Sequence, residues 1–266
     1  MQNSRNVINL YSESDSVAMS LQTNKQAWED FAELDPAYAI LTDRQFKFND
    51  WDLDKFFETG AQEIDKVLEK ARKIGYPSRW QIALDFGCGV GRLTRSLTKY
   101  FDTVYGVDLS ATMISKAKKL NTDVPQCEFI TNDKADLKIF PDQYFDLIYS
   151  NIVLQHISKR SIIKNYVLDL SRTLKKNGLF VFQLPDYIPL AHRLSQSYLR
   201  PRSRLFSLFS MLGVDKAHLY EKMGLRPAII MNYIPKNQML LFLASIDMKV
   251  LDLEIAQNSV TYYVTH

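Results

Sequence analysis

The chain has 266 residues, which is enough for one elaborated α/β domain or for two small domains. Its content of 46% hydrophobic and 24% charged residues excludes intrinsic disorder and a fibrous repeat. A net charge of +3 is too small to indicate a nucleic-acid partner, and no apolar run approaches the roughly 20 residues of a membrane span. The two cysteines lack CxxC spacing, which argues against a zinc site. We expect a cytoplasmic protein with neither a nucleic acid nor a membrane as partner, and its oligomeric state stays open.

The N-terminal quarter of the chain is expected to hold two helices behind an irregular start. The first 27 or so residues are polar and show no clear period, which predicts a loosely held arm. Apolar residues then recur at helical spacing over 27–34, up to Pro36, and again over 52–74. Gly75 follows the second of these segments and predicts its end.

Short apolar segments alternate with helical patterns from about residue 80 onward. Such alternation predicts a parallel sheet with helices on both of its faces. The predicted strands are 82–86, 103–108, 127–131, 144–150 and 179–184, and the helices between them are 91–100, 111–120 and 158–174.

The strand rhythm breaks after the fifth strand, from Pro185 to about Ala228, before the chain closes on a predicted antiparallel pair. The elements expected in this last part are helices over 190–199, 205–212 and 235–246 and strands over 249–256 and 259–265.

A glycine-rich turn connects the first predicted strand to the helix after it. The segment is Ala83-Leu84-Asp85-Phe86-Gly87-Cys88-Gly89-Val90-Gly91-Arg92-Leu93. Glycines at alternate positions let the backbone approach a ligand closely, and the helix start offers unpaired N–H groups. At the end of the next strand, 21 residues after Gly87, Asp108 can accept hydrogen bonds from both hydroxyls of a ribose. Together these features predict a nucleoside-containing cofactor.

Two other interpretations of this turn stay open. A dinucleotide fingerprint, GxGxxG, would need a glycine where Arg92 stands, and the third glycine is Gly91 instead. The second interpretation is a turn with a purely structural role between strand and helix, followed by an aspartate on the surface. S-adenosylmethionine (SAM) carries an ammonium, a carboxylate, a ribose and a sulfonium, and an acid such as Asp85 suits this cation better than a diphosphate.

Several motifs in residues 80–185 resemble those of the class I SAM-dependent methyltransferases, of the bacterial small-molecule type. The turn of Asp85 to Gly91 resembles their motif I, and Val107-Asp108-Leu109-Ser110 with Met113 resembles their ribose-binding segment. The segments 145–150 and 153–157 are similar to their fourth-strand motif. The family's Leu-x-Pro-Gly-Gly turn corresponds to Leu174-Lys175-Lys176-Asn177-Gly178, which lacks the proline and one glycine.

The resemblance implies a seven-stranded, mostly parallel, doubly wound α/β sheet whose last strand is antiparallel and lies beside the sixth. It implies a cofactor domain over 76–266, preceded by an arm and helices over 1–75 that cap the site. It also implies SAM at the carboxyl ends of the strands. The cofactor-binding residues that it implies are Asp85, Gly87, Gly89 and Gly91 near the methionine part, Asp108 at the ribose, Leu109 and Met113 beside the adenine, Asp133 at the adenine amine and Asn151 at the methionine amine. Asp133 as an ordinary loop residue is an alternative.

The acceptor is less well defined by the sequence. Ser150-Asn151-Ile152-Val153 lacks the Asn-Pro-Pro-aromatic sequence of enzymes that methylate exocyclic amines, and no set of acids there predicts a metal. His156 is the best candidate for a catalytic base, because an imidazole titrates near neutral pH. Asp186, after the fifth strand, is the second catalytic candidate. For each of them a purely structural role, as a packed or capping side chain, is the alternative.

The insertion over 186–228 is expected to form a helical lid over the acceptor. The segment from Pro185 to Ala228 contains seven basic and three acidic residues, a surplus of 7 − 3 = +4, which suits an anionic acceptor. Solvated helix faces explain the same charges. The sequence therefore predicts methyl transfer from SAM to a hydroxyl or carboxylate oxygen of a small molecule, in secondary-metabolite or sugar biosynthesis. The alternatives are N-methylation of a small amine or peptide and a non-catalytic SAM-binding subunit.

Overall fold

The computed structural model of the chain describes residues 13–41 and 51–266, and its centre is one seven-stranded sheet. The strand order is β3-β2-β1-β4-β5-β7-β6, with β7 antiparallel to both of its neighbours, as expected from the sequence. The strands are β1 (Ile82–Phe86), β2 (Thr103–Asp108), β3 (Cys127–Thr131), β4 (Phe145–Ser150), β5 (Leu174–Pro185), β6 (Lys249–Ala256) and β7 (Ser259–Thr265).

Alternating side chains of each central strand supply two separate cores. In β5, Phe180 and Phe182 face one side of the sheet, and Leu179 and Val181 face the other, because successive side chains of a strand point in opposite directions. All four are fully buried, as expected for a mostly parallel sheet that is covered on both faces. The near-continuous apolar character of these strands is thus explained by their position.

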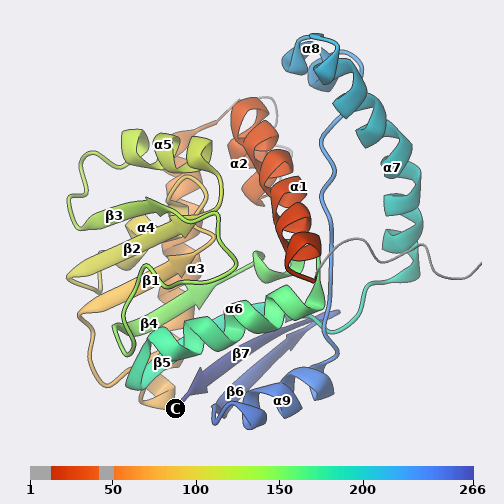
Figure 1. Ribbon diagram of the computed structural model, residues 1–266. Helices are drawn as coiled ribbons and strands as arrows, with labels where there is room; N and C mark the ends of the chain where they lie inside the picture. The colour runs from red at the N-terminus through yellow and green to blue at the C-terminus, as the bar shows by residue number, and fades with distance from the viewer. Residues whose placement is uncertain (1–12, 42–50) are drawn as a thin grey trace, which may run out of the picture.

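Helices cover both faces of the sheet (Figure 1). The first face packs against α3 (Leu53–Ile74) and α4 (Arg92–Leu97), and the second against α6 (Arg160–Thr173) and α9 (Lys236–Ser245). At the β2–β3 end of the sheet lies α5 (Ala111–Leu120). The predicted second helix was thus correct within one residue: Asp52 accepts a hydrogen bond from the Lys55 N–H at its start, and Gly75, at φ 82°, ends it.

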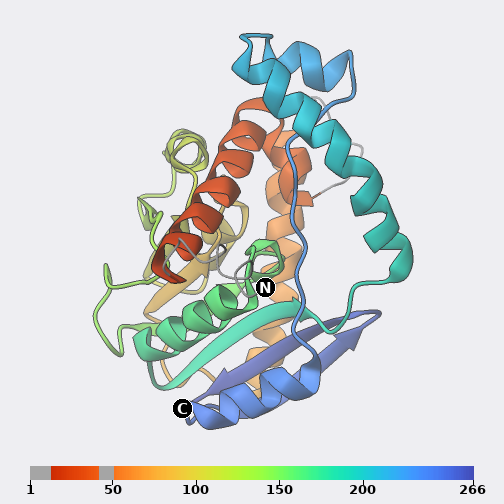
Figure 2. The same ribbon diagram turned by 45° about the vertical axis from the view of Figure 1, so that its right-hand side comes forward.

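The expected N-terminal arm is wrong from residue 13 onward, because this segment forms α1 (Glu13–Leu34), followed by α2 (Pro36–Leu41). In both views α1 passes across the carboxyl-terminal edge of the sheet (Figures 1 and 2). Phe31 is buried, whereas Leu21 and Trp28 are only partly buried and line a cavity at the edge of the core. A helix that covers a cavity needs no continuous apolar stripe, so the helical periodicity in the sequence before residue 27 was weak. Residues 1–12 lie outside the described part.

The insertion after β5 also differs from its prediction. The helices expected over 190–199 and 205–212 are one helix, α7 (Leu190–Met211), with Pro201 inside it, and a short α8 (Lys216–Glu221) follows. A proline inside a helix removes one backbone hydrogen bond but does not have to end it. The chain then returns between α1 and α7 (Figure 2). No helix in the described residues is long and apolar enough to cross a membrane.

Candidate active site

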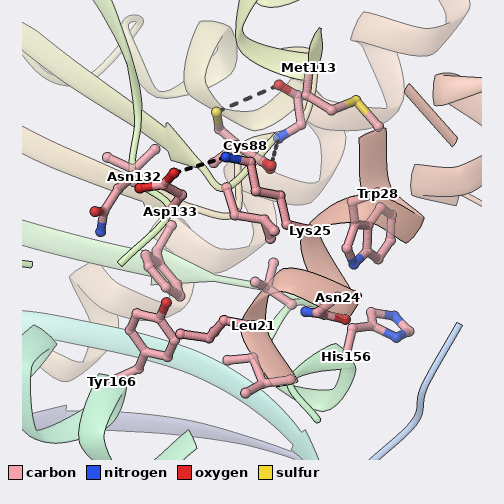
Figure 3. A pocket seen from close by; sticks show the side chains of 18 of the residues that line it. Leu21, Asn24, Lys25, Trp28, Cys88, Met113, Asn132, Asp133, His156 and Tyr166 are labelled. Carbon is pink, nitrogen blue, oxygen red and sulfur yellow. Dashed lines mark hydrogen bonds and ion pairs between the residues drawn. The ribbon is translucent and has the colours of Figure 1, made fainter. Parts of the chain in front are cut away.

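A cavity of about 580 Å³ lies at the carboxyl ends of β1, β2 and β4. This volume falls within the range of roughly 300–1,000 Å³ that is typical of small-molecule sites. The loops after these strands form its floor, and α1 forms its roof with Leu21, Asn24, Lys25 and Trp28 (Figure 3). The position agrees with the rule that open α/β sheets bind ligands at the carboxyl ends of their strands.

The glycine turn after β1 forms one wall of the cavity in a conformation that suits glycine. Gly87 has φ 83° and Gly91 has φ 88°, in the left-handed region that other residues avoid. A Cβ atom on Gly87 would also lie 2.3 Å from the Val153 side chain. The turn is held to β2, because the N–H groups of Gly87 and Cys88 both donate to the Val107 carbonyl, at 2.7 and 3.0 Å. The backbone is therefore bare and fixed where it meets the cavity.

Asp108 stands at the cavity with its carboxylate held by backbone groups. One oxygen accepts the Gly89 N–H and the other the Ser110 N–H, both at 2.9 Å. Burial raises the pKa of Asp108, and these two backbone hydrogen bonds oppose the rise. A carboxylate has about four acceptor positions, so two remain for the hydroxyls of a ribose. Asp108 thus fits the role that the sequence predicts for it.

Asp85 is not among the described residues that line the cavity, in contrast to the predicted contact with the cofactor. Its buried carboxylate accepts a hydrogen bond of 2.7 Å from the Thr94 hydroxyl, under the glycine turn. Burial raises the pKa of Asp85 to about 7. The side chain of a residue one position before the end of β1 points to the α4 side of the sheet, which is why it cannot reach the cavity.

The residues predicted at the adenine lie at the end of the cavity near α5. Leu109, Met113 and Asp133 all line it. Asp133 is already paired, because the Lys25 ammonium of α1 lies 2.9 Å from its carboxylate, and this hydrogen bond lowers the pKa of Asp133 (Figure 3). The neighbouring Asn132 donates to the Asp136 carbonyl at 2.6 Å. The ion pair with Lys25 uses one carboxylate oxygen of Asp133.

Asn151 lines the cavity and is oriented by a half-buried acid, Glu63, that the sequence did not indicate. Its side-chain amide donates to Glu63 of α3 at 2.7 Å, and the Tyr149 hydroxyl donates to the same oxygen at 2.9 Å. The other Glu63 oxygen lies 2.7 Å from the guanidinium of Arg92, which is 5% exposed and also lines the cavity. Glu63 comes from a helix that is remote in sequence, so no local spacing could indicate it.

His156 lies in the same cavity as the glycine turn, on the short η2 helix (Leu154–His156) that follows β4. Its Nδ1 is 2.9 Å from the Ile230 carbonyl, which can only accept, so Nδ1 carries the proton. Its Nε2 is 3.2 Å from the Gln155 amide nitrogen, and its ring meets Trp28 edge-on at 5.4 Å. Burial lowers the pKa of His156, although the bond to Ile230 opposes this. The ring is therefore neutral at pH 7, with Nε2 as an acceptor.

Asp186 has a structural position, and the prediction that it is catalytic receives no support. Its carboxylate accepts the Lys236 N–H at 2.5 Å, at the first turn of α9. Its own N–H donates to the Asn258 carbonyl in the β6–β7 turn. Asp186 is not among the described cavity-lining residues. The carboxylate thus gives a partner to an N–H group at the start of α9 that would otherwise lack one. This is the structural role, as a capping side chain, that the sequence left open for Asp186.

Among the residues whose side chains are described, no basic residue of the insertion lines the cavity either. Arg202 donates to the carbonyls of Met223 and Gly224 within the insertion. Lys216 of α8 lies 2.8 Å from Asp30 and 2.7 Å from Glu33 of α1. The insertion thus supports α1 from outside, and α1 itself covers the cavity.

Glu29 is a second residue that only the structure brings to the site. It lies on α1 and accepts hydrogen bonds from the Ser110 hydroxyl and from the N–H groups of Ala111 and Thr112, at 2.9, 2.7 and 3.1 Å. Burial would raise its pKa, but these hydrogen bonds to Thr112 and Ser110 lower it overall. Glu29 therefore caps α5 from another helix, directly beside Asp108.

Glu29→Ala is expected to lower the melting temperature by about 2–4 °C, because loss of a helix cap costs about 1 kcal/mol in a chain of this size. SAM affinity should fall a few-fold, since α1 is released from the ribose end of the cavity. Calorimetry measures both quantities. Glu33→Ala, which removes only an exposed partner of Lys216, is the control. An affinity that changes equally in both variants would show that Glu29 has no particular role.

The fold and the site agree with a family of known proteins. Residues 84–182 match the family model described as a methyltransferase domain. The chain is 37% identical over 126 residues to a malonyl-[acyl-carrier protein] O-methyltransferase of Halalkalibacterium halodurans, which covers 46% of this chain and 45% of that one. It is 28% identical over 108 residues to phosphoethanolamine N-methyltransferase 3 of Arabidopsis thaliana, covering 40% and 22%. The chain spans about half the length, or less, of these curated relatives.

Among solved structures, magnesium protoporphyrin IX methyltransferase from Synechocystis PCC 6803 with bound SAM superposes with a TM-score of 0.60. It is 16% identical and covers 97% of this chain and 99% of that one, which shows a shared fold. The strand order is thus that of the Rossmann-like, class I methyltransferase fold. Residues 84–182 match the methyltransferase domain, and the SAM in the solved structure belongs to a protein of the same fold.

Proposed function

We propose that this protein transfers the methyl group of SAM to a hydroxyl oxygen of a small molecule. The observation that carries the proposal is His156, a neutral imidazole with Nε2 as acceptor, in the same cavity as the glycine turn and Asp108. A hydroxyl needs a base when it attacks, and a histidine held neutral at pH 7 is suited to that task.

The residues present fit the proposed cofactor. Gly87 and Gly89 line the cavity with backbone alone, which lets the methionine part approach the chain closely, and the free positions on Asp108 suit the ribose hydroxyls. Leu109 and Met113 supply an apolar surface for the adenine. The remaining contacts that we propose are Asp133 at the adenine amine and Asn151, oriented by Glu63, at the methionine amine. Gly91 is not among the described cavity-lining residues, and its Cβ position lies against Phe129 and Asn121, so its role is to shape the turn.

When bound, SAM supplies an electrophilic methyl group on its sulfonium. The hydrogen bond from His156 Nδ1 to the Ile230 carbonyl fixes the ring plane, and Nε2 accepts the proton of the acceptor hydroxyl. The acceptor hydroxyl replaces the Gln155 amide as the partner of Nε2. Trp28, packed edge-on against the ring, confines the acceptor and supports alignment for in-line attack.

Oxygen rather than nitrogen is proposed because of this base. The relatives include both an O- and an N-methyltransferase, so the domain match does not select the acceptor atom. An amine attacks through its lone pair and has less need of a fixed neutral imidazole. A carboxylate acceptor would need a cationic partner. Of the three cations among the described cavity-lining residues, Lys25 and Arg92 are paired with Asp133 and Glu63, and Lys134 directly follows Asp133 at the end proposed for the adenine.

A small acceptor is proposed because α1 covers the cavity. The cavity that holds His156 is lined by apolar side chains that include Leu21, Trp28 and Ile157, together with the polar Asn24. The acceptor should therefore present an apolar or aromatic body beside its hydroxyl. The insertion over 186–228 contributes indirectly, because Lys216 binds the acids of α1. Biosynthesis of a small metabolite fits such an acceptor.

The proposed function is tested first through its cofactor. SAM and its demethylated product should both raise the melting temperature, since a ligand that binds only the folded state stabilises it, and NAD at equal concentration should not. Transfer of labelled methyl from SAM is then measured on matched hydroxyl, amine and carboxylate compounds with the same aromatic body. Preferential labelling of the amine would refute O-methylation. Binding of SAM with no labelling of any compound would favour a non-catalytic subunit.

A further inference from the structure

The outer side of α7 carries an apolar stripe that the proposed function does not use. Leu190, Leu194, Leu205 and Leu208 are 68%, 63%, 43% and 50% exposed. At about 3.6 residues per turn these four leucines fall within an arc of roughly 60° on the helix. Leu212, which follows the helix, continues the stripe and is 70% exposed. A leucine row of this kind is unusual on a surface that only water covers.

The opposite side of α7 holds the helix in place. Phe206 is 1% exposed and packs with Leu219 and Tyr220 of α8 and with Leu34 of α1. No helix or strand of the described residues packs on the outer side of α7 in either view (Figures 1 and 2). The leucines are therefore presented outward by a helix whose other face is anchored.

The charge of this helix has one sign. Residues 187–214 contain four arginines and neither aspartate nor glutamate. Arg193 and Arg204 are both exposed and lie on one flank of the leucine stripe, by the same helical spacing. A helix with a leucine face bordered by arginines is the arrangement of peripheral membrane helices, in which the leucines enter the acyl boundary and the guanidinium groups meet lipid phosphates.

We propose that α7 docks this protein on the surface of an anionic lipid bilayer. The charge of the helix favours an anionic surface, and a stripe along a helix of 22 residues, which spans about 33 Å, matches a flat interface. No membrane span is needed, so the absence of a spanning helix among the described residues is compatible with this docking. The docking is independent of the acceptor and of methyl transfer.

The test is co-sedimentation of the purified full chain with vesicles, which needs neither cofactor nor acceptor. The wild type should pellet with phosphatidylcholine vesicles that contain phosphatidylglycerol, weakly with pure phosphatidylcholine, and less at high salt. The double variant Leu194→Ser/Leu208→Ser should bind at least about tenfold more weakly, because two apolar side chains leave the acyl boundary. Arg204→Glu should weaken binding about tenfold to the anionic vesicles alone.

Two matched controls use exposed residues elsewhere on the surface. Leu241→Ser on α9, where Leu241 is 73% exposed, and Lys249→Glu on β6 should both bind like the wild type. An unchanged melting temperature without ligand checks that each variant is folded. A wild type that stays in the supernatant with anionic vesicles overturns the proposal, as does a double leucine variant that pellets fully. A dimer that the leucine variant converts to a monomer, or binding to polyglutamate without binding to vesicles, would assign the face to a protein partner instead.

Discussion

Replacing His156 with Ala is expected to lower kcat about 10²- to 10⁴-fold for a hydroxyl acceptor, while SAM affinity stays nearly unchanged. The variant removes the only proposed proton acceptor but leaves the glycine turn and Asp108 intact. Single-turnover kinetics with labelled SAM, together with calorimetry of SAM binding, measure the two effects separately. Asp186→Asn is the matched control, since Asp186 binds the start of α9 and should change kcat little.

The pH dependence of the same reaction follows from the state of the imidazole. Catalysis requires neutral His156, so kcat/KM should rise with pH through its pKa and then reach a plateau. Because burial lowers this pKa, the midpoint should lie below the usual value of about 6.5. A rise that persists in His156→Ala would identify another titrating group. If kcat in the variant stays within about threefold of the wild type, catalysis rests on alignment alone.

Asp108→Ala is expected to weaken SAM binding by one hundredfold or more. It removes two charge-assisted hydrogen bonds to the ribose, each worth about 1.5–3 kcal/mol, and about 1.4 kcal/mol corresponds to tenfold in affinity. It also removes the carboxylate that holds the Gly89 and Ser110 N–H groups at 2.9 Å, so the glycine turn loses a support. Isothermal titration calorimetry measures the change directly.

The matched control for Asp108 is Asp133→Ala. Asp133 also lines the cavity, but one of its oxygens is bound to Lys25, so its loss should weaken SAM binding only a few-fold. Equal losses in the two variants would mean that the ribose is not held at Asp108. Unchanged SAM affinity in Asp108→Ala would refute the proposed placement of the cofactor, because this placement depends on hydrogen bonds from the ribose hydroxyls to the Asp108 carboxylate.

Local features of the sequence were sufficient for the sheet and for the position of the glycine turn and Asp108 at its carboxyl edge. The strands 82–86, 103–108 and 127–131 were predicted with the bounds that the structure has, because runs of apolar residues between turn signals define them without reference to distant contacts. The turn at Gly87 and the acid at Asp108 were predicted for the same reason. A strand end, a turn and a helix start are all determined within a few residues, and parallel strands place their ends together.

The tertiary structure alone decided which side chains support the site from other elements. Glu29 caps α5 from α1, Glu63 orients Asn151 from α3, and the Ile230 carbonyl selects the tautomer of His156. Each of these contacts joins segments more than 70 residues apart, and sequence spacing has no information on such pairs. Asp186 is the opposite case: it follows β5, where a catalytic residue was predicted, but its carboxylate binds the N–H group at the start of α9. Local periodicity reports burial within an element, whereas the partner of a polar group depends on how the elements pack.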